Sequence, residues 1–200
     1  MSVTHVFFDI GGVLGTNGWD REQRLRAIEH FGLEPEFEVR HDELAGDWEI
    51  GRLTLDEYLQ SAVFFTPRSF TPDEFTSFMF AESQPYSETI AIARRLAARG
   101  DVLLMTLNNE ASELNLHRIG TFGLRDIFSA FFSSCWLGVR KPSHTIFDRA
   151  LNIAQVPAAD VLFVDDREQN LVPARALGFE THRYTSALAL ERELSGRTLL

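Results

Sequence analysis

Five short apolar runs, separated by longer stretches of mixed polarity, set the pattern of the chain. They lie at residues 3–8, 102–106, 130–133, 161–164 and roughly 179–184. The first, second and fourth runs are almost entirely apolar, which is typical of strands in a sheet that is covered on both faces. The pattern therefore predicts five strands, three of which are fully buried.

Helical patterns fill most of the intervals after residue 86. They read SETIAIARRLAAR from Ser87, ASELNLHRI from Ala111, HTIFDRALNIA from His144, REQNLVPARAL from Arg167 and SALALEREL from Ser186. Strands that alternate with helices indicate crossover connections, which join parallel strands. We therefore predict an α/β fold with a doubly wound parallel sheet.

Residues 16–83 break this alternation. They contain no strand-like apolar run and instead show helical segments interrupted by glycine and proline. Most of their aromatic side chains, Trp48 among them, are expected to form a core of their own, with one or two left to line a pocket. We predict a catalytic core made of residues 1–15 and 84–200, with a small helical cap, residues 16–83, inserted after the first strand.

Composition narrows the class of protein. The 200 residues are 44% hydrophobic, carry a formal net charge of −10 and contain no run of Lys or Arg, which argues against nucleic acid and anionic membranes as partners. Cys135 is the only cysteine, so an internal disulfide is excluded and a reducing compartment fits. The first residues lack signal-peptide features, and no apolar run approaches the roughly 20 residues of a membrane span. We expect a cytoplasmic protein; its oligomeric state is not predicted.

The first candidate for chemistry is Asp9, at the end of the first apolar run. Gly11 and Gly12 follow it and allow a sharp turn that brings backbone amides close to a bound anion. A carboxylate in this position can act as a nucleophile toward phosphorus. An aspartate that merely caps a turn is the commoner occurrence, so Asp9 needs support from other residues.

Two further stretches offer that support. Thr106 closes the second apolar run, where its hydroxyl and nearby amides could bond a phosphoryl oxygen, and Asn108 or Asn109 could orient the substrate. Lys141 lies just before a helix, where one ammonium could neutralise phosphate while holding Asp9 ionised. Each signal is weak alone, because threonines at strand ends and surface lysines are common.

The sharpest signal is the pair Asp165 and Asp166 at the end of the fourth apolar run. Two adjacent carboxylates there are costly unless a cation compensates them. Because ligands of parallel sheets bind outside the carboxyl ends of the strands, Asp9 is expected to face this pair. Such a set suits Mg²⁺, with Asn170 helping to orient the carboxylates. The stretches together predict one phosphate-handling site.

The chain resembles the haloacid dehalogenase superfamily, whose four motifs occur here in the same order. They are FFDIGGVL, LLMTLNN, GVRKP and VLFVDDREQN. The resemblance implies a Rossmann-like sheet, an insertion that is the small cap, and catalysis by Asp9, Thr106 and Lys141. The phosphate-binding residues that it implies are Gly11, Gly12, Thr106, Leu107, Asn108 and Lys141. The metal ligands that it implies are Asp9, the carbonyl of Gly11, Asp165 and Asp166.

Within the superfamily the chain most resembles the bacterial glucose-1-phosphate phosphatase branch, through the cap phrase DWEIGRLTLDEYL. That branch also lacks the aspartate, two residues past the nucleophile, that usually donates and accepts the reaction's protons; here Gly11 stands in its place. Three interpretations stay open: a cap residue or water supplies the proton, the leaving group departs readily without one, or the protein no longer turns over substrate. Glu49 and Asp47 are the candidate acids.

The sequence therefore predicts a Mg²⁺-dependent phosphomonoester hydrolase that acts on a small phosphorylated metabolite, for which resemblance suggests a sugar phosphate. Three alternatives fit the residues less well. A carbon–halogen hydrolase needs no acidic pair such as Asp165 and Asp166. A receiver domain has the acidic pair first and the lysine last, the reverse of this order. A silent binding protein is suggested by Gly11 and by Leu107, where the family often has Asn, but it has no reason to keep clustered carboxylates. The histidines, at positions 5, 30, 41, 117, 144 and 182, are interpreted as structural or surface groups.

Overall fold

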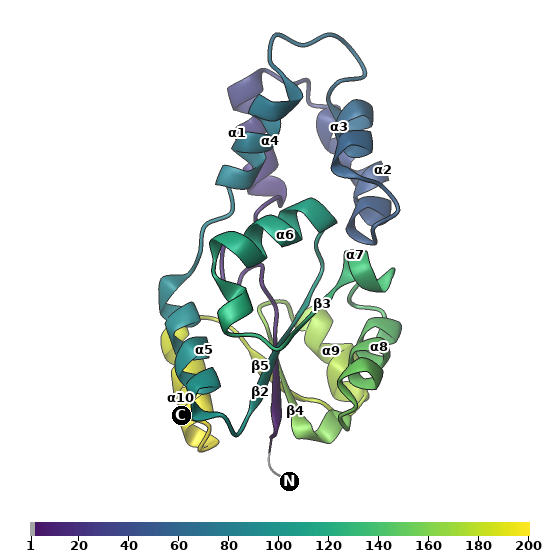
Figure 1. Cartoon of the computed structure of the whole chain (residues 1–200). Coiled ribbons are helices and arrows are strands. Elements are labelled where there is room, and N and C mark those ends of the chain that lie inside the picture. Colours follow the sequence, from purple (N-terminus) through teal and green to yellow (C-terminus); the bar gives the residue numbers. More distant parts are fainter. Residues whose placement is uncertain (1–2) are drawn as a thin grey trace.

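The computed structural model describes residues 3–200 and is built on one five-stranded parallel sheet (Figure 1). Its strands are β1 (His5–Phe8), β2 (Leu103–Asn108), β3 (Ala130–Ser133), β4 (Val161–Asp165) and β5 (Glu180–Arg183). They lie in the order β3-β2-β1-β4-β5, and every neighbouring pair is parallel. The predicted α/β fold with a parallel sheet is confirmed. Because β1 is central, the residue that follows it lies between the ends of β2 and β4.

Helices cover both faces of the sheet, as the apolar strands require. The helices of the core are α5 (Ser87–Arg99), α6 (Ser112–Thr121), α7 (Ser134–Leu137), α8 (His144–Ala154), α9 (Glu168–Ala176) and α10 (Ala187–Gly196), with the 3₁₀ turns η1 (Leu124–Asp126) and η2 (Ala158–Asp160). Side chains alternate along β1, so Phe8 packs in the cluster with α5 and α10 while Phe7 packs in the cluster with α8 and α9. This two-sided burial fixes which face each strand residue occupies.

The end of strand β2 and the short helix α7 differ from the prediction. Strand β2 continues to Asn108, two residues beyond the predicted end at Thr106. The predicted apolar run stops at Thr106, but Leu107 and Asn108 are also buried. Both pair with β3, so the hydrogen-bonded strand continues beyond the predicted end. The short helix α7, which begins directly after β3, has too few residues to show a period and was not predicted.

Between β1 and α5 the chain forms four helices: α1 (Arg21–Phe31), α2 (Phe37–Glu49), α3 (Leu55–Ala62) and α4 (Pro72–Ala81). We call residues 21–81 the cap; in Figure 1 it stands over one end of the sheet. Thr54 and Thr71 begin α3 and α4 with capping boxes. The ring of Phe75 is completely buried in a cluster rich in aromatic side chains, which the cap forms together with Trp19 and with Ala111 and Leu114 of the core. The helical character of this insertion agrees with the prediction, and its assignment as a separate domain stays a prediction.

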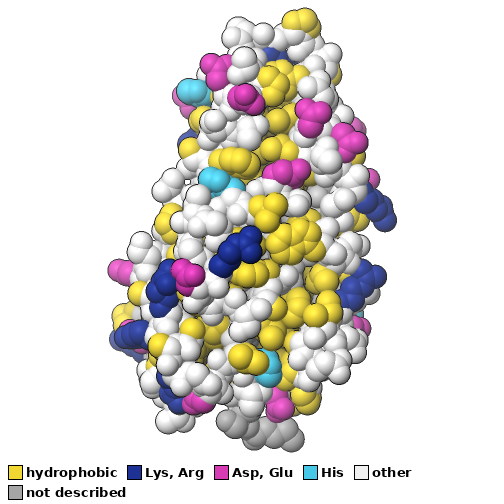
Figure 2. Space-filling model, in the orientation of Figure 1, with side chains coloured by type: hydrophobic (Ala, Val, Ile, Leu, Met, Phe, Trp, Pro, Cys, Tyr) yellow, Lys and Arg dark blue, Asp and Glu magenta, His cyan; other side chains and the backbone are white. Residues whose placement is uncertain are grey.

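On the face that Figure 2 shows, hydrophobic side chains are spread over both the cap and the core. Acidic side chains predominate among the charged groups over the cap, and most Lys and Arg side chains lie over the core. Within residues 3–200, no helix has the length and apolar character needed to cross a membrane.

Candidate active site

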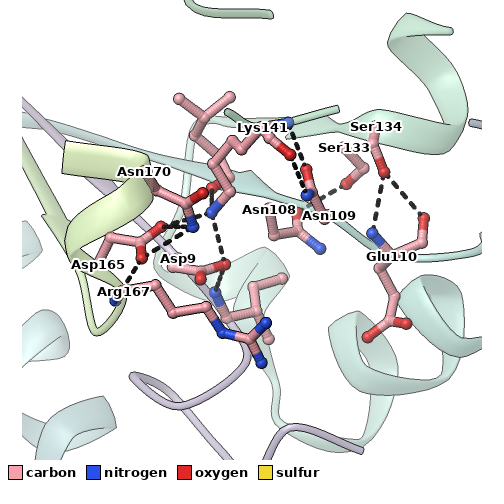
Figure 3. Close-up of polar contacts among 12 residues, drawn as sticks. Asp9, Asn108, Asn109, Glu110, Ser133, Ser134, Lys141, Asp165, Arg167 and Asn170 are labelled. Atoms are coloured by element: carbon pink, nitrogen blue, oxygen red, sulfur yellow. Dashed lines mark hydrogen bonds and ion pairs between the residues drawn. The ribbon is translucent and has the colours of Figure 1, made fainter. Parts of the chain in front are cut away.

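Asp9 stands at the centre of the carboxyl edge of the sheet. Its backbone N–H donates to the carbonyl of Val164, 2.9 Å away, which extends the pairing of β1 with β4 by one residue. Its Oδ1 accepts a hydrogen bond of 2.8 Å from the N–H of Ile10 and lies 3.1 Å from Nζ of Lys141 (Figure 3). The Asp9 side chain is buried, and both of these contacts hold its carboxylate through the same oxygen, Oδ1.

Lys141 is buried beside Asp9 and is fixed from both ends. Nζ donates to Oδ2 of Asp165 at 2.6 Å and to the carbonyl of Leu107 at 2.9 Å. The side chain of Asn109 clamps the Lys141 backbone, accepting from its N–H at 2.8 Å and donating to its carbonyl at 2.9 Å (Figure 3). The ammonium predicted from the sequence is thus positioned by a loop residue that follows β2.

Asp165 serves mainly as the anchor of Lys141. Besides the lysine contact, it accepts from the N–H of Arg167 at 2.8 Å, and the Asn170 amide donates to both of its oxygens at 3.0 Å. Each oxygen of Asp165 therefore already has two donors. Asn170 does orient a carboxylate, as predicted, and the carboxylate is the one that faces Lys141.

Asp166 is the carboxylate of the pair with a free oxygen. Its Oδ1 is buried and has no hydrogen-bond partner among residues 3–200. Gly12 lies against it with φ +74°, and a Cβ at this position would come within 2.4 Å of Oδ2 of Asp166. Both the backbone conformation and the close approach require glycine. The Gly12 turn thus determines how near the loop after β1 comes to Asp166.

The residues present fit a divalent cation. Oxygens of Asp9, Asp165 and Asp166 lie within 4.8 Å of one another. The Lys141 ammonium contacts Asp9 and Asp165, and the charge of Arg167 acts on Asp166. Burial raises the pKa of Asp9 to about 8 and also raises the pKa of Asp166. Burial acts to lower the pKa of Lys141, but the charges of Asp165 and Asp9 outweigh it and raise that pKa. More positive charge is what this cluster needs to hold its carboxylates ionised.

Some predicted phosphate-binding residues are placed differently. Thr106 is completely buried inside β2, its hydroxyl has no partner in the described part of the chain, and it does not line the pocket around Asp9. Leu107 contributes its carbonyl to Lys141, while its side chain belongs to the core. The amide of Asn108 is engaged by Asn115 at 3.1 Å and Ser133 at 2.9 Å. Phosphate binding by these residues stays a prediction.

A pocket of about 380 Å³ lies between the core and the cap at this edge of the sheet. From the core it is lined by Asp9, Gly11, Asn109, Glu110, Ala111, Arg118, Arg140, Lys141, Pro142, Arg167, Gln169 and Asn170. From the cap and the segment leading into it, it is lined by Asn17, Trp19, Asp20, Arg24, His41, Asp42, Ala45, Trp48 and Glu49. Asp9 and Lys141 therefore open toward a space whose far wall is made by the cap.

The pocket separates the two acids proposed from the sequence. Glu49 lines it and pairs with Arg140 at 2.7 Å, so a core residue meets the end of α2. Asp47 is not among the lining residues; its side chain is half exposed and pairs with Arg52 at 3.0 Å. Asp47 is thus the weaker of the two candidates, because its carboxylate faces away from the pocket.

Glu110 is a pocket residue that the sequence interpretation missed. Burial raises the pKa of its carboxyl to about 7, even though Nη1 of Arg118 lies 3.1 Å from Oε2. A Cβ at Gly11 would lie 3.6 Å from the same Nη1, so Arg118 connects Glu110 to the position where the superfamily usually has its acid. Its place just after β2, two residues beyond Asn108, was the available signal. The cap residues His41 and Trp48 gave no such signal, because only tertiary packing brings them to the pocket.

The sequence profile of the haloacid dehalogenase-like hydrolases matches residues 3–178, so the chain belongs to this family of hydrolases. The chain is also similar to two curated fungal proteins. One is the sesquiterpene phosphatase astK of Aspergillus oryzae, 29% identical over 56% of each chain. The other is the drimenol cyclase drtB of Aspergillus calidoustus, 26% identical over 79% of this chain and 30% of that protein. The matches span about half of the first relative and less than a third of the second.

Among solved structures, a family enzyme from Bacteroides thetaiotaomicron, in complex with magnesium and inorganic phosphate, superposes with a TM-score of 0.80. It is 20% identical, and the match covers 92% of this chain and 95% of that one. This likeness shows that the two chains share a fold.

Proposed function

We propose that this hydrolase is a Mg²⁺-dependent phosphomonoesterase that works through an aspartyl-phosphate on Asp9. The observation that carries the proposal is the cluster of three carboxylates, two of them buried and in contact with the Lys141 ammonium, beside a pocket. A carbon–halogen hydrolase has no need for the acidic pair Asp165 and Asp166. The phosphatase among the similar proteins supports the same choice.

We assign the attack to Oδ2 of Asp9. Oδ1 is occupied by the N–H of Ile10 and by Lys141, whereas no hydrogen bond to Oδ2 is formed within residues 3–200. Oδ2 forms a bond to phosphorus as the bond from phosphorus to the ester oxygen breaks. Lys141 then lies beside the phosphoryl oxygens and neutralises part of their charge. Water attacks phosphorus in the second step, which releases inorganic phosphate and restores Asp9.

The residues that would hold Mg²⁺ are Asp9, Asp166 and the carbonyl of Gly11. Asp165 is the fourth predicted ligand; two hydrogen bonds reach each of its oxygens, one of them from Lys141, so it also anchors that ammonium. When bound, the ion supplies positive charge to the phosphoryl oxygens. The free, buried Oδ1 of Asp166 and the glycine that approaches Oδ2 are the observations that fit such an ion.

We assign the missing proton transfers to Glu110. General acids work best when their pKa lies near the working pH, and burial raises the pKa of Glu110 to about 7. The carboxyl donates a proton to the departing ester oxygen, and it later takes one from the attacking water. Glu49 also lines the pocket, and like Glu110 it pairs with an arginine, here Arg140. Glu110 is preferred because it is the more deeply buried of the two and pairs with the arginine that approaches Gly11.

For the substrate we propose a small phosphorylated metabolite, with a sugar phosphate as the suggested class. The support is the cap phrase that resembles the glucose-1-phosphate phosphatase branch, together with the many polar side chains that line the pocket. The cap contacts that choose among such esters are considered below.

The decisive test uses p-nitrophenyl phosphate with and without Mg²⁺. Asp9→Asn is expected to lower phosphate release by at least about 10³-fold, because it removes the nucleophile, and EDTA is expected to abolish release. Asp101→Asn is the matched control, since Asp101 is an exposed core aspartate paired with Arg99. Undiminished turnover by the Asp9 variant would remove the proposed nucleophile. Chloride release from 2-chloropropionate without metal would point to a dehalogenase instead.

A further inference from the structure

Helix α2 turns one face toward the pocket. His41, Ala45 and Trp48 all line it, and their spacing of four and three residues places them on the same side of the helix. Ala45 has a small side chain, so the rings of His41 and Trp48 project further from the helix than the residue between them. This face belongs to the cap and lies opposite the side of the pocket that holds Asp9.

A buried chain of hydrogen bonds determines where the His41 proton sits. The indole N–H of Trp19 can only donate, and it donates to the hydroxyl oxygen of Tyr58 at 3.1 Å. Tyr58 is completely buried, so its own proton needs an acceptor, and Nδ1 of His41 lies 2.9 Å from the hydroxyl. Nδ1 therefore accepts from Tyr58. A neutral His41 ring must then carry its proton on Nε2.

The surroundings of His41 keep this ring neutral. Burial and, to a smaller extent, the charge of Arg24 lower the pKa of His41 to about 3, while the charge of Asp20 opposes them. Arg24 is itself paired with Glu38 at 2.7 Å. Nε2 forms no hydrogen bond with any of residues 3–200, and it is not sealed from solvent. Its N–H is thus a free donor on a residue that lines the pocket.

Trp48 contributes a ring surface to the same face. Its ring is stacked on Tyr58 with centroids 4.1 Å apart and planes 4° from parallel, so Tyr58 holds both ring systems of α2 in place. The indole N–H of Trp48 is sealed from solvent, so it does not face the empty pocket. Nε2–H of His41 is therefore the donor that this face offers to a ligand.

We infer that the α2 face of His41, Ala45 and Trp48 binds an oxygen acceptor in the organic part of the substrate, with Nε2–H of His41 as the donor. The inference rests on the proposed function, because it describes the leaving group of the ester that Asp9 attacks. A hydrocarbon group would leave Nε2–H of His41 unsatisfied. The substrate class is therefore a phosphate ester of a hydroxylated alcohol. Tyr58 and Trp19 are positioning residues, since they act through the His41 tautomer.

The test compares two esters of primary alcohols of equal carbon number, sorbitol 6-phosphate and hexyl phosphate. His41→Phe keeps an aromatic ring but removes the donor. It is expected to lower kcat/KM for the sorbitol ester about 3- to 10-fold, the effect of one neutral hydrogen bond, mainly through a higher KM. Hydrolysis of the hexyl ester is expected to change less than about twofold. His144→Phe, at an exposed position of α8, is the matched control.

Two results would overturn the inference: an equal loss on both esters, or no loss on either. Because wild-type hydrolysis of p-nitrophenyl phosphate tests the proposed function separately, failure of that reaction is distinguishable from failure of the α2 site.

A readout that needs no turnover is the ¹⁵N spectrum of the histidine rings. It is expected to show His41 with a protonated Nε2 and a bare Nδ1 that does not titrate between pH 6 and 8. Tyr58→Phe is expected to remove this signature. A wild-type His41 protonated on Nδ1 would contradict the proposal even if the Tyr58 variant does not fold.

Discussion

The two walls of the pocket are built in different ways. On the sheet side, Lys141 contacts Asp9, Asp165 and the carbonyl of Leu107, and its backbone is clamped by Asn109, so its position is over-determined. On the cap side, an aromatic cluster supports a face on which Nε2–H of His41 has no partner among residues 3–200. The difference indicates that the reacting groups are fixed by the core, whereas the cap leaves a donor open for a variable organic group.

The largest expected effect tests whether the cap is a structural unit with its own core. Phe75 is completely buried among the rings of Trp19, Phe31, Phe37, Phe64 and Phe70. Phe75→Ala should cost about 3–5 kcal/mol of unfolding free energy, measured by urea denaturation. Phe65→Ala, at an exposed position of the cap, is the control. An equal, small cost for both variants would show that the cap has no tightly packed core.

A substitution of Glu110 tests the proposed proton transfers, because Glu110 lines the pocket from the core. Glu110→Gln should lower kcat for an alkyl phosphate by about 10²-fold and leave p-nitrophenyl phosphate much less affected, because nitrophenolate departs without a proton. The ratio of the two rates is the measurement. Glu49→Gln is the comparison, with a smaller change expected. A uniform loss on both esters would assign Glu110 a structural role through Arg118.

Gly12 tests the acidic cluster without removing a carboxylate. Gly12→Ala should weaken Mg²⁺ binding by about 10- to 100-fold in calorimetry, since its Cβ would displace Asp166. Gly32→Ala is a matched control: Gly32 also has a positive φ, +61°, but a Cβ there meets nothing within 4 Å. Equal Mg²⁺ affinity in the two variants would contradict a metal site at Asp166.

The smallest effect concerns a charge pair that stays within the cap. Hydrogen bonds from Arg68 lower the pKa of Glu34 to about 2 from an ordinary value of 4.5. A lowered folded-state pKa means stability that is present above pH 4.5 and lost as the pH falls toward 2. Glu34→Gln should therefore cost below about 1 kcal/mol at pH 7, because the pair is partly exposed, and less at pH 3. A pH-independent difference in unfolding free energy between wild type and variant would contradict the pairing.

The sequence predicted the sheet side of the pocket well, because its information is local. Asp9, Asp165 and Asp166 each follow an apolar strand, and parallel strands bring their ends together. The end of β2 was misplaced by two residues, since Leu107 and Asn108 are held by pairing with β3 rather than by an apolar run.

The cap side could not be predicted in the same way. His41 was interpreted as a structural or surface group, and Trp48 as one more core aromatic. Their role depends on Tyr58, seventeen residues from His41 in sequence, and on a stacking geometry that leaves no periodic trace. Donors that lack partners become visible only when the packing around them is known.

The most direct test of the account is the covalent state of Asp9 during turnover. Rapid acid quench of the enzyme with Mg²⁺ and p-nitrophenyl phosphate, followed by peptide mass spectrometry, should find one phosphoryl group on the peptide that contains Asp9, sensitive to hydroxylamine. The Asp9→Asn variant should show none. A phosphoryl group on another residue, or turnover with no phosphorylated peptide in the presteady state, would contradict an aspartyl-phosphate on Asp9.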